Sequence, residues 1–124
     1  MNYLTLWCYL DDEIVDLKSR FEKAFRSDEL MRDYENDWEW IYGFSDLNNC
    51  MINISREHNM KNGLKEKPLR IRIETVNDLT DELLNETISA IQTEFKATVY
   101  FGTIEGRGTE MNEYLVENEF KYET

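Results

Sequence analysis

Two segments of this chain repeat apolar side chains at the spacing of a helix, and the runs around them alternate with the period of two that is typical of strands. The helical stripes predict one helix over residues 14–26 and another over residues 83–95. The residues that can cap them are Asp11 or Asp12 for the first helix and Asn77 or Thr80 for the second. Because each helix has a single apolar stripe, each needs only one neighbouring layer to cover it.

Alternation typical of strands occurs in six runs. They cover residues 3–10, 38–44, 50–57, 97–104 and 113–123, together with a run that begins near residue 69. A turn-rich segment, residues 45–49, joins the second and third runs as a hairpin. Residues 27–37 are polar and acidic, and a short helix or an acidic loop fits this segment equally. The predicted fold class is therefore α+β: a mostly antiparallel sheet of about six strands with two helices packed on one face, in the order β-α-β-β-β-α-β-β.

The apolar content is sufficient for one packed domain. A chain of 124 residues with 41% hydrophobic and 13% aromatic residues can bury a core, so we expect a single domain over residues 1–124. The first apolar run, Tyr3 to Leu10, is too short to span a bilayer and lacks the positive segment of a signal peptide. We therefore expect a cytoplasmic protein without a membrane partner.

Two helices on one face of the sheet would leave the other face uncovered. The aromatic strand positions that remain for that face are Tyr3, Trp7, Tyr9, Trp38, Trp40, Tyr42 and Tyr100. Both indoles of the Trp38 to Trp40 segment point to the same side of their strand, because side chains two residues apart share a face. Two interpretations stay open at this point: the indoles belong to the core, or at least one is an interface hot spot. In the second case, the acids that would rim the patch are Asp33, Glu35, Asp37 and Glu39.

The residues that usually carry chemistry are few. His58 is the only histidine and lies in a region rich in lysine and asparagine, so we expect an exposed imidazole rather than a catalytic one. Cys8 and Cys50 lie inside strand-like runs without the spacing of a zinc site, and we interpret both as small buried hydrophobes. The acids at residues 11–13 complement the dipole at a helix start. We expect no catalytic residue, no metal, no cofactor and no enzymatic activity.

The charge of the chain favours one class of partner. There are 26 Asp and Glu residues against 14 Lys and Arg residues, a formal net charge of −12. Such an excess steers cationic surfaces toward the protein and repels polyphosphates. The strand and helix order with sheet aromatics also resembles RNA-recognition modules, but basic residues concentrate only in residues 56–72. We therefore expect a basic protein partner and no direct binding of nucleic acid.

In size, acidity and α+β order, the chain resembles the small bacterial immunity proteins that accompany polymorphic and contact-dependent inhibition toxins. The local part of this resemblance is the element Trp38-Glu39-Trp40-Ile41-Tyr42-Gly43. The resemblance implies an antitoxin that binds and neutralises one cognate toxin domain, usually a nuclease in the cytosol of the same cell. The residues expected to bind the partner are Trp38, Trp40, Tyr42, Asp33, Glu35, Asp37 and Glu39. We expect a monomer or a weak homodimer.

Two other classes of function stay open. One is a small-ligand-binding or enzymatic α+β domain whose site carries no recognisable motif, and the other is a structural subunit. A large upstream gene that ends in a small basic toxin domain would favour the immunity hypothesis. A solitary metabolic context would favour the ligand or enzyme hypothesis.

Overall fold

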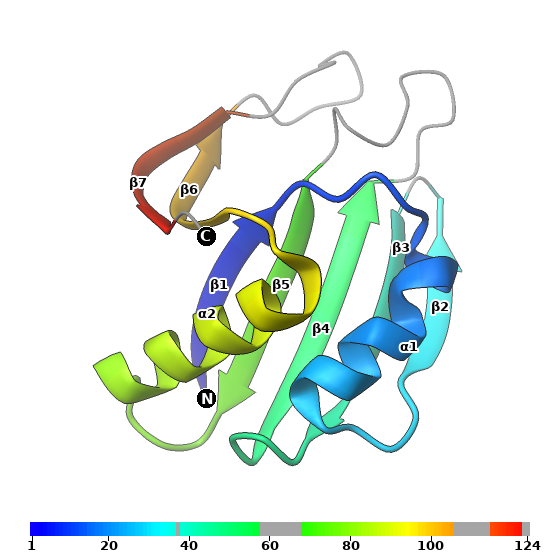
Figure 1. Cartoon of the computed structure of the whole chain (residues 1–124), viewed down its shortest axis with the longest axis horizontal. Helices are drawn as coiled ribbons and strands as arrows, with labels where there is room; N and C mark the ends of the chain where they lie inside the picture. Colours follow the sequence, from blue (N-terminus) through cyan, green and yellow to red (C-terminus); the bar gives the residue numbers. More distant parts are fainter. Residues whose placement is uncertain (37, 58–67, 106–114, 123–124) are drawn as a thin grey trace.

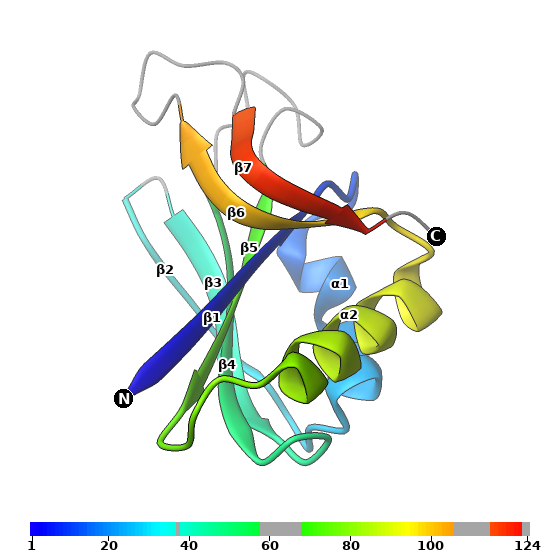
Figure 2. The same ribbon diagram turned by 90° about the vertical axis from the view of Figure 1, so that its left-hand side faces the viewer.

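One antiparallel sheet and two helices make up the described part of the chain, which in this computed structural model is residues 1–36, 38–57, 68–105 and 115–122. The elements are β1 (Asn2–Cys8), α1 (Ile14–Phe25), β2 (Met31–Glu35), β3 (Trp38–Ser45), β4 (Cys50–Glu57), β5 (Leu69–Thr75), α2 (Asp81–Phe95), β6 (Val99–Glu105) and β7 (Leu115–Tyr122). The strands pair in the order β2-β3-β4-β5-β1-β6-β7, and every pair is antiparallel. Both helices lie against the same face of the sheet (Figures 1 and 2). The predicted fold class is confirmed.

The helices form where the apolar stripes predict them. In α2, Oγ1 of Thr80 accepts a hydrogen bond from the N–H of Leu83 at 3.1 Å, so Thr80 is the N-cap. The cap of α1 differs from the prediction: Glu13 occupies the N-cap position, and its side chain makes no capping bond. Both helices end at a residue in the left-handed conformation, Arg26 for α1 and Lys96 for α2.

The core lies between the two helices and the face of the sheet that they cover. Alternate residues of the central strands point into the core. Leu6, Ile54 and Ile71 are examples, and all three are fully buried. The aromatic members of the core are Phe21, Phe25 and Phe95, and the rings of Phe21 and Phe95 are 4.5 Å apart. Burial of these side chains is the main stabilising contribution of the helix layer.

Gly43 is the position on β3 against which Leu30, in the connection between α1 and β2, packs. A Cβ atom at residue 43 would lie 2.9 Å from Cδ2 of Leu30 and 3.7 Å from the carbonyl oxygen of Glu29. Leu30 is fully buried. A side chain at residue 43 would therefore force the Leu30 side chain to shift within the core.

β2 is an edge strand in the segment for which the sequence left a short helix or an acidic loop open. It pairs with β3 from Met31↔Tyr42 to Glu35↔Trp38, and all five of its residues are exposed. A strand that buries no face leaves no alternation of apolar and polar residues in the sequence. Backbone pairing with β3 forms this strand, and its charged side chains suit an edge that faces water.

Two predictions lie outside the described residues. They concern Asp37 and His58. The remaining strand predictions agree with the structure to within two residues at each end, including the last strand, predicted at 113–123 and observed as β7.

Candidate binding surface

The face of the sheet that carries no described helix is the candidate binding surface, and we call it the open face (Figure 2). The strand alternation and the pairing register place one residue in two on this face. Its aromatic and methionine side chains are Tyr3, Trp7, Met31, Trp38, Trp40, Tyr42, Phe44, Met51 and Tyr100. The aromatic positions predicted for this face all lie on it except Tyr9, which follows the end of β1, and Met31, Phe44 and Met51 join them.

The register aligns these side chains in rows across the sheet. One row runs through the cross-strand partners Trp7, Arg70, Ser55, Trp40 and Asp33 on β1, β5, β4, β3 and β2. Cross-strand neighbours are close enough for side chains to touch. The row therefore passes from an aromatic residue over an arginine to a second aromatic residue, and it ends at an acid on the edge of the sheet.

The exposure of the open face decides between the two interpretations of the indoles. Trp38 is 39% exposed, Tyr42 37% and Phe44 49%, while Trp40 is half-buried. The core residues of the same strand, such as Ile41, are fully buried on the opposite side. Neither indole therefore belongs to the core beneath the helices, and large aromatic surface stays accessible to a partner.

Two arginines of β5 lie on the open face and stack on its aromatic rings. The guanidinium carbon of Arg72 lies 3.8 Å from the ring centroid of Tyr3, and that of Arg70 lies 5.7 Å from the ring of Trp38. Both distances are within the range of cation–π attraction. The two arginines are therefore placed against aromatic rings of the open face.

The predicted rim acids divide between the two faces. Asp33 and Glu35 lie on the open face as the cross-strand partners of Trp40 and Trp38. Glu39 does not, because residues 38 and 40 occupy the open face and residue 39 points to the other side. Its side chain is 9% exposed and accepts hydrogen bonds from Arg32. The prediction that Glu39 rims the aromatic patch is therefore wrong, and Asp37 lies outside the described residues.

A shallow depression of about 350 Å³ opens on this face. It is lined by Asp33, Trp40, Tyr42, Met51, Ile52, Asn53 and Glu74. Two of these residues are aromatic and two carry carboxylates, and they come from β2, β3, β4 and β5. The depression is therefore assembled by the pairing of four strands rather than by one loop.

Arg56, the first residue of the basic stretch 56–72, is a buried cation on the helix-facing side. It is 3% exposed and donates to the backbone carbonyl of Asp12 at 2.6 Å and to that of Leu10 at 2.5 Å. Burial lowers the pKa of this guanidinium, and the charge of Glu39 opposes that change. Arg56 thus joins β4 to the β1–α1 connection.

Most exposed acids of the described residues lie on the helices and the connections that flank them. They are Asp11, Asp12, Glu13, Asp16, Asp28, Glu29, Asp78, Asp81, Glu82 and Glu86. The exposed bases of the same region are Lys23, Arg26 and Lys96. Among the residues whose exposure is described, the negative charge therefore lies mainly on the helix layer, whereas the open face carries both acids and arginines.

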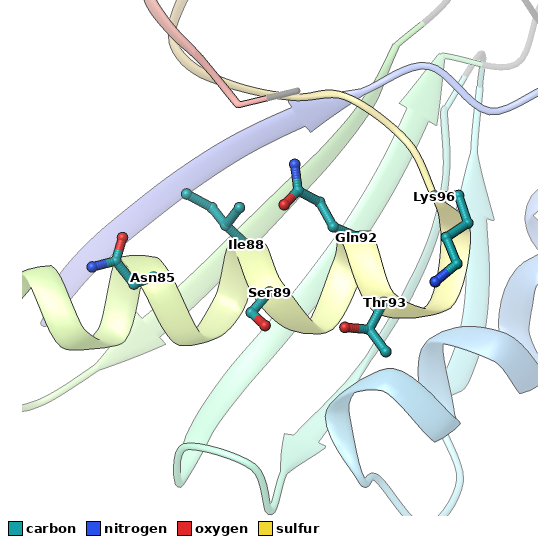
Figure 3. Close-up of a pocket in the computed structure, with 6 residues that line it drawn as sticks. All are labelled: Asn85, Ile88, Ser89, Gln92, Thr93 and Lys96. Carbon is teal, nitrogen blue, oxygen red and sulfur yellow. The ribbon is translucent and has the colours of Figure 1, made fainter. Parts of the chain in front are cut away.

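A second depression, of about 320 Å³, lies along α2 (Figure 3). Its lining residues are Asn85, Ile88, Ser89, Gln92, Thr93 and Lys96. All six come from α2 and its C-cap, and Lys96 is the only titratable one. This depression brings together no pair of groups capable of acid–base chemistry.

Within the described residues, no group of three or more His, Cys, Asp or Glu side chains is placed to hold a metal ion. Neither described helix is long and apolar enough to cross a membrane. No protein-family model, no curated protein and no solved structure matches this chain.

Proposed function

We propose that this protein binds and neutralises a basic partner protein through its open face, in the manner of the bacterial immunity proteins that it resembles. The partner of such a protein is a toxin domain. A basic nuclease that acts in the cytosol is the class of toxin that the negative charge of this protein would attract. The observation that carries the proposal is the open face itself. It is an accessible aromatic surface on a regular sheet, with a carboxylate edge formed by β2.

The aromatic side chains are suited to anchor a partner. Trp and Tyr are enriched among the residues that dominate binding energies, because they bury a large area with few rotatable bonds. Trp38 and Tyr42 are both partly exposed on β3, and the sheet fixes the spacing between them. An interface centred on β3 would bury these rings without a change in the backbone.

The distribution of charge favours a protein partner over a nucleic acid. Arg70 and Arg72 on the open face engage the rings of Trp38 and Tyr3, and the acids Asp33 and Glu35 lie on the same face. The net charge of −12 repels a phosphate backbone. A basic protein is attracted by the same field.

The test is inhibition of a defined toxin. The domain to use is a basic domain encoded by the neighbouring reading frame, assayed with and without this protein at increasing ratios. We expect stoichiometric inhibition by the wild type and weaker inhibition by Trp38→Ala and Trp40→Ala. The matched control is Val76→Ala, because Val76 is 80% exposed and lies beyond β5. Unaltered toxin activity at excess wild-type protein, or full inhibition by a folded double indole variant, would contradict the proposal.

A further inference from the structure

We infer that the depression on the open face is a receptor for one arginine side chain of the protein partner. The inference deepens the proposed function and rests on it in one respect, namely that a partner protein presents the arginine. It is carried by three properties of the depression: aromatic walls, a carboxylate beside the indole that pairs with no described cation, and a size that fits one side chain.

The walls supply the attraction for a planar cation. Trp40 and Tyr42 lie two residues apart on β3, so both rings stand on the same side of the strand. Trp40 is half-buried and Tyr42 is 37% exposed, which leaves ring surface open to the depression. Aromatic faces attract guanidinium groups, and the planar guanidinium can stack on an indole in a way that an ammonium cannot.

The two carboxylates of the depression lack a cationic partner among the described residues. Oδ1 of Asp33 accepts the backbone N–H of Tyr34 at 2.8 Å, which orients the carboxylate at the edge strand. Glu74 forms no ion pair within the described part of the chain, and the nearby Arg72 stacks on Tyr3 instead. Asp33 is the cross-strand neighbour of Trp40, whereas Glu74 lies on β5, three strands away from β2, so a guanidinium stacked on Trp40 can pair with Asp33 alone. A carboxylate binds the fork of an arginine in a bidentate manner.

The volume and polarity also fit this occupant. A depression of about 350 Å³ lies at the lower end of the range for ligand sites, so it suits one long side chain better than a larger ligand. Met51 and Asn53 contribute an apolar wall and an amide on the β4 side. The aliphatic stem of an arginine can pack on Tyr42 while its head reaches Asp33.

The experiment titrates short capped peptides into the isotope-labelled protein and follows the indole N–H signal of Trp40 by NMR. The probes are Gly-Arg-Gly, Gly-Lys-Gly and Gly-citrulline-Gly, each acetylated and amidated, since citrulline keeps the shape of arginine without its charge. We expect the arginine peptide to shift the Trp40 signal and to bind more tightly than the lysine peptide. We expect the citrulline peptide to leave the signal in place.

A variant tests the carboxylate. Asp33→Asn should weaken arginine-peptide binding about two- to fivefold, the range for a partly exposed ion pair. The matched control is Glu86→Gln, which removes one exposed acid from α2 and should leave the affinity unchanged. Equal weakening by both variants, equal affinity for arginine and citrulline, or equal affinity for arginine and lysine would overturn the inference.

The peptide titration needs no partner protein, so the two proposals fail separately. Toxin inhibition that persists while no peptide shifts Trp40 would overturn the arginine receptor alone. Peptide binding at Trp40 by a protein that leaves the toxin active would support the receptor and contradict the proposed function.

Discussion

Arg32 and Glu39 form an ion pair on the helix-facing side of the β2–β3 edge, where Nε of Arg32 donates to Oε2 of Glu39 at 2.9 Å and Nη2 donates to the same oxygen. Glu39 is 7% exposed and lies opposite the buried Arg56 in the β3–β4 register. The carboxylate therefore pairs with the guanidinium of Arg32, and its charge also acts on that of Arg56. Its charge stabilises the sheet edge and is withheld from any partner on the open face.

Replacement of Glu39 tests that assignment. Glu39→Ala should lower the free energy of unfolding by about 1–3 kcal/mol, because it removes the ion-pair partner of Arg32 and one of the negative charges that act on the buried Arg56. Asp33→Ala removes an exposed acid from the neighbouring strand and should change the free energy by less than about 0.5 kcal/mol. Urea denaturation measures both values. Equal losses in the two variants would show that Glu39 has no special structural role.

The core between the sheet and the helices gives the second prediction. Leu6→Ala and Ile88→Ala should each cost about 2–5 kcal/mol, because Leu6 is fully buried and Ile88 is 5% exposed. Val76→Ala is the control, since Val76 is 80% exposed, and it should cost less than about 0.5 kcal/mol. A shift of the denaturation midpoint by Val76→Ala as large as that of Leu6→Ala would place the core elsewhere.

Glu22 predicts an acid-sensitive contribution to stability. Burial raises the pKa of its carboxyl, but hydrogen bonds from the Lys18 ammonium and the Leu30 N–H outweigh this effect and lower the pKa below 4.5. A lowered pKa in the folded state stabilises the protein above pH 4.5, and the contribution is lost as the pH falls through the folded value.

The matching measurement is the free energy of unfolding against pH for the wild type and Glu22→Gln. The two curves should be separated near neutral pH and should converge as the pH falls below 4.5. Lys23→Ala on the same helix is the control, because Lys23 is 79% exposed on its side chain. A constant separation between the curves at every pH would contradict the assignment.

The thiol of Cys8 should be unreactive in the folded protein. It is fully buried, and burial raises its pKa to about 12 while the charge of Arg56 opposes the rise. Because the thiolate is the reactive form, a disulfide reagent such as Ellman's reagent should label Cys8 only after denaturation. Mass mapping of labelled peptides with and without urea measures this. Rapid labelling of the native protein at Cys8 would show that β1 opens readily.

The sequence predicted the elements that bury a face and missed the one that does not. β3 and β4 were predicted to within one residue at each end, because apolar alternation and a turn-rich connection mark them. Met31 to Glu35 was left as a short helix or an acidic loop, since all five side chains are exposed. The strand exists through its backbone pairs with β3, and single-residue patterns do not record such pairs.

The candidate surface was predicted only in part, because some of its contacts depend on which strands pair. Strand parity was sufficient to place Trp38, Trp40 and Tyr42 on one face. The same alternation places Glu39 on the opposite face from Trp38 and Trp40, so it argues against Glu39 as a rim residue. Its partner Arg32 can be identified only from the structure, because the pairing depends on β2 being a strand. The contact between Arg72 and Tyr3 joins residues far apart in the sequence, so it depends on the β1–β5 register.

The last prediction separates anchoring from steering in the proposed complex. Trp40→Ala removes ring area from the open face, so it should chiefly raise the dissociation rate constant. Charge reversal at Asp81 and Glu82, exposed acids at the start of α2, should chiefly lower the association rate constant, because it weakens the attractive field without touching the open face. Surface plasmon resonance with the basic toxin domain at several salt concentrations measures both constants. Association of the wild type should slow as salt rises, since the field is screened over about 10 Å at 0.1 M ionic strength. If salt leaves association unchanged, the net charge has no part in recognition, and if Trp40→Ala leaves dissociation unchanged, the partner binds a surface other than the open face.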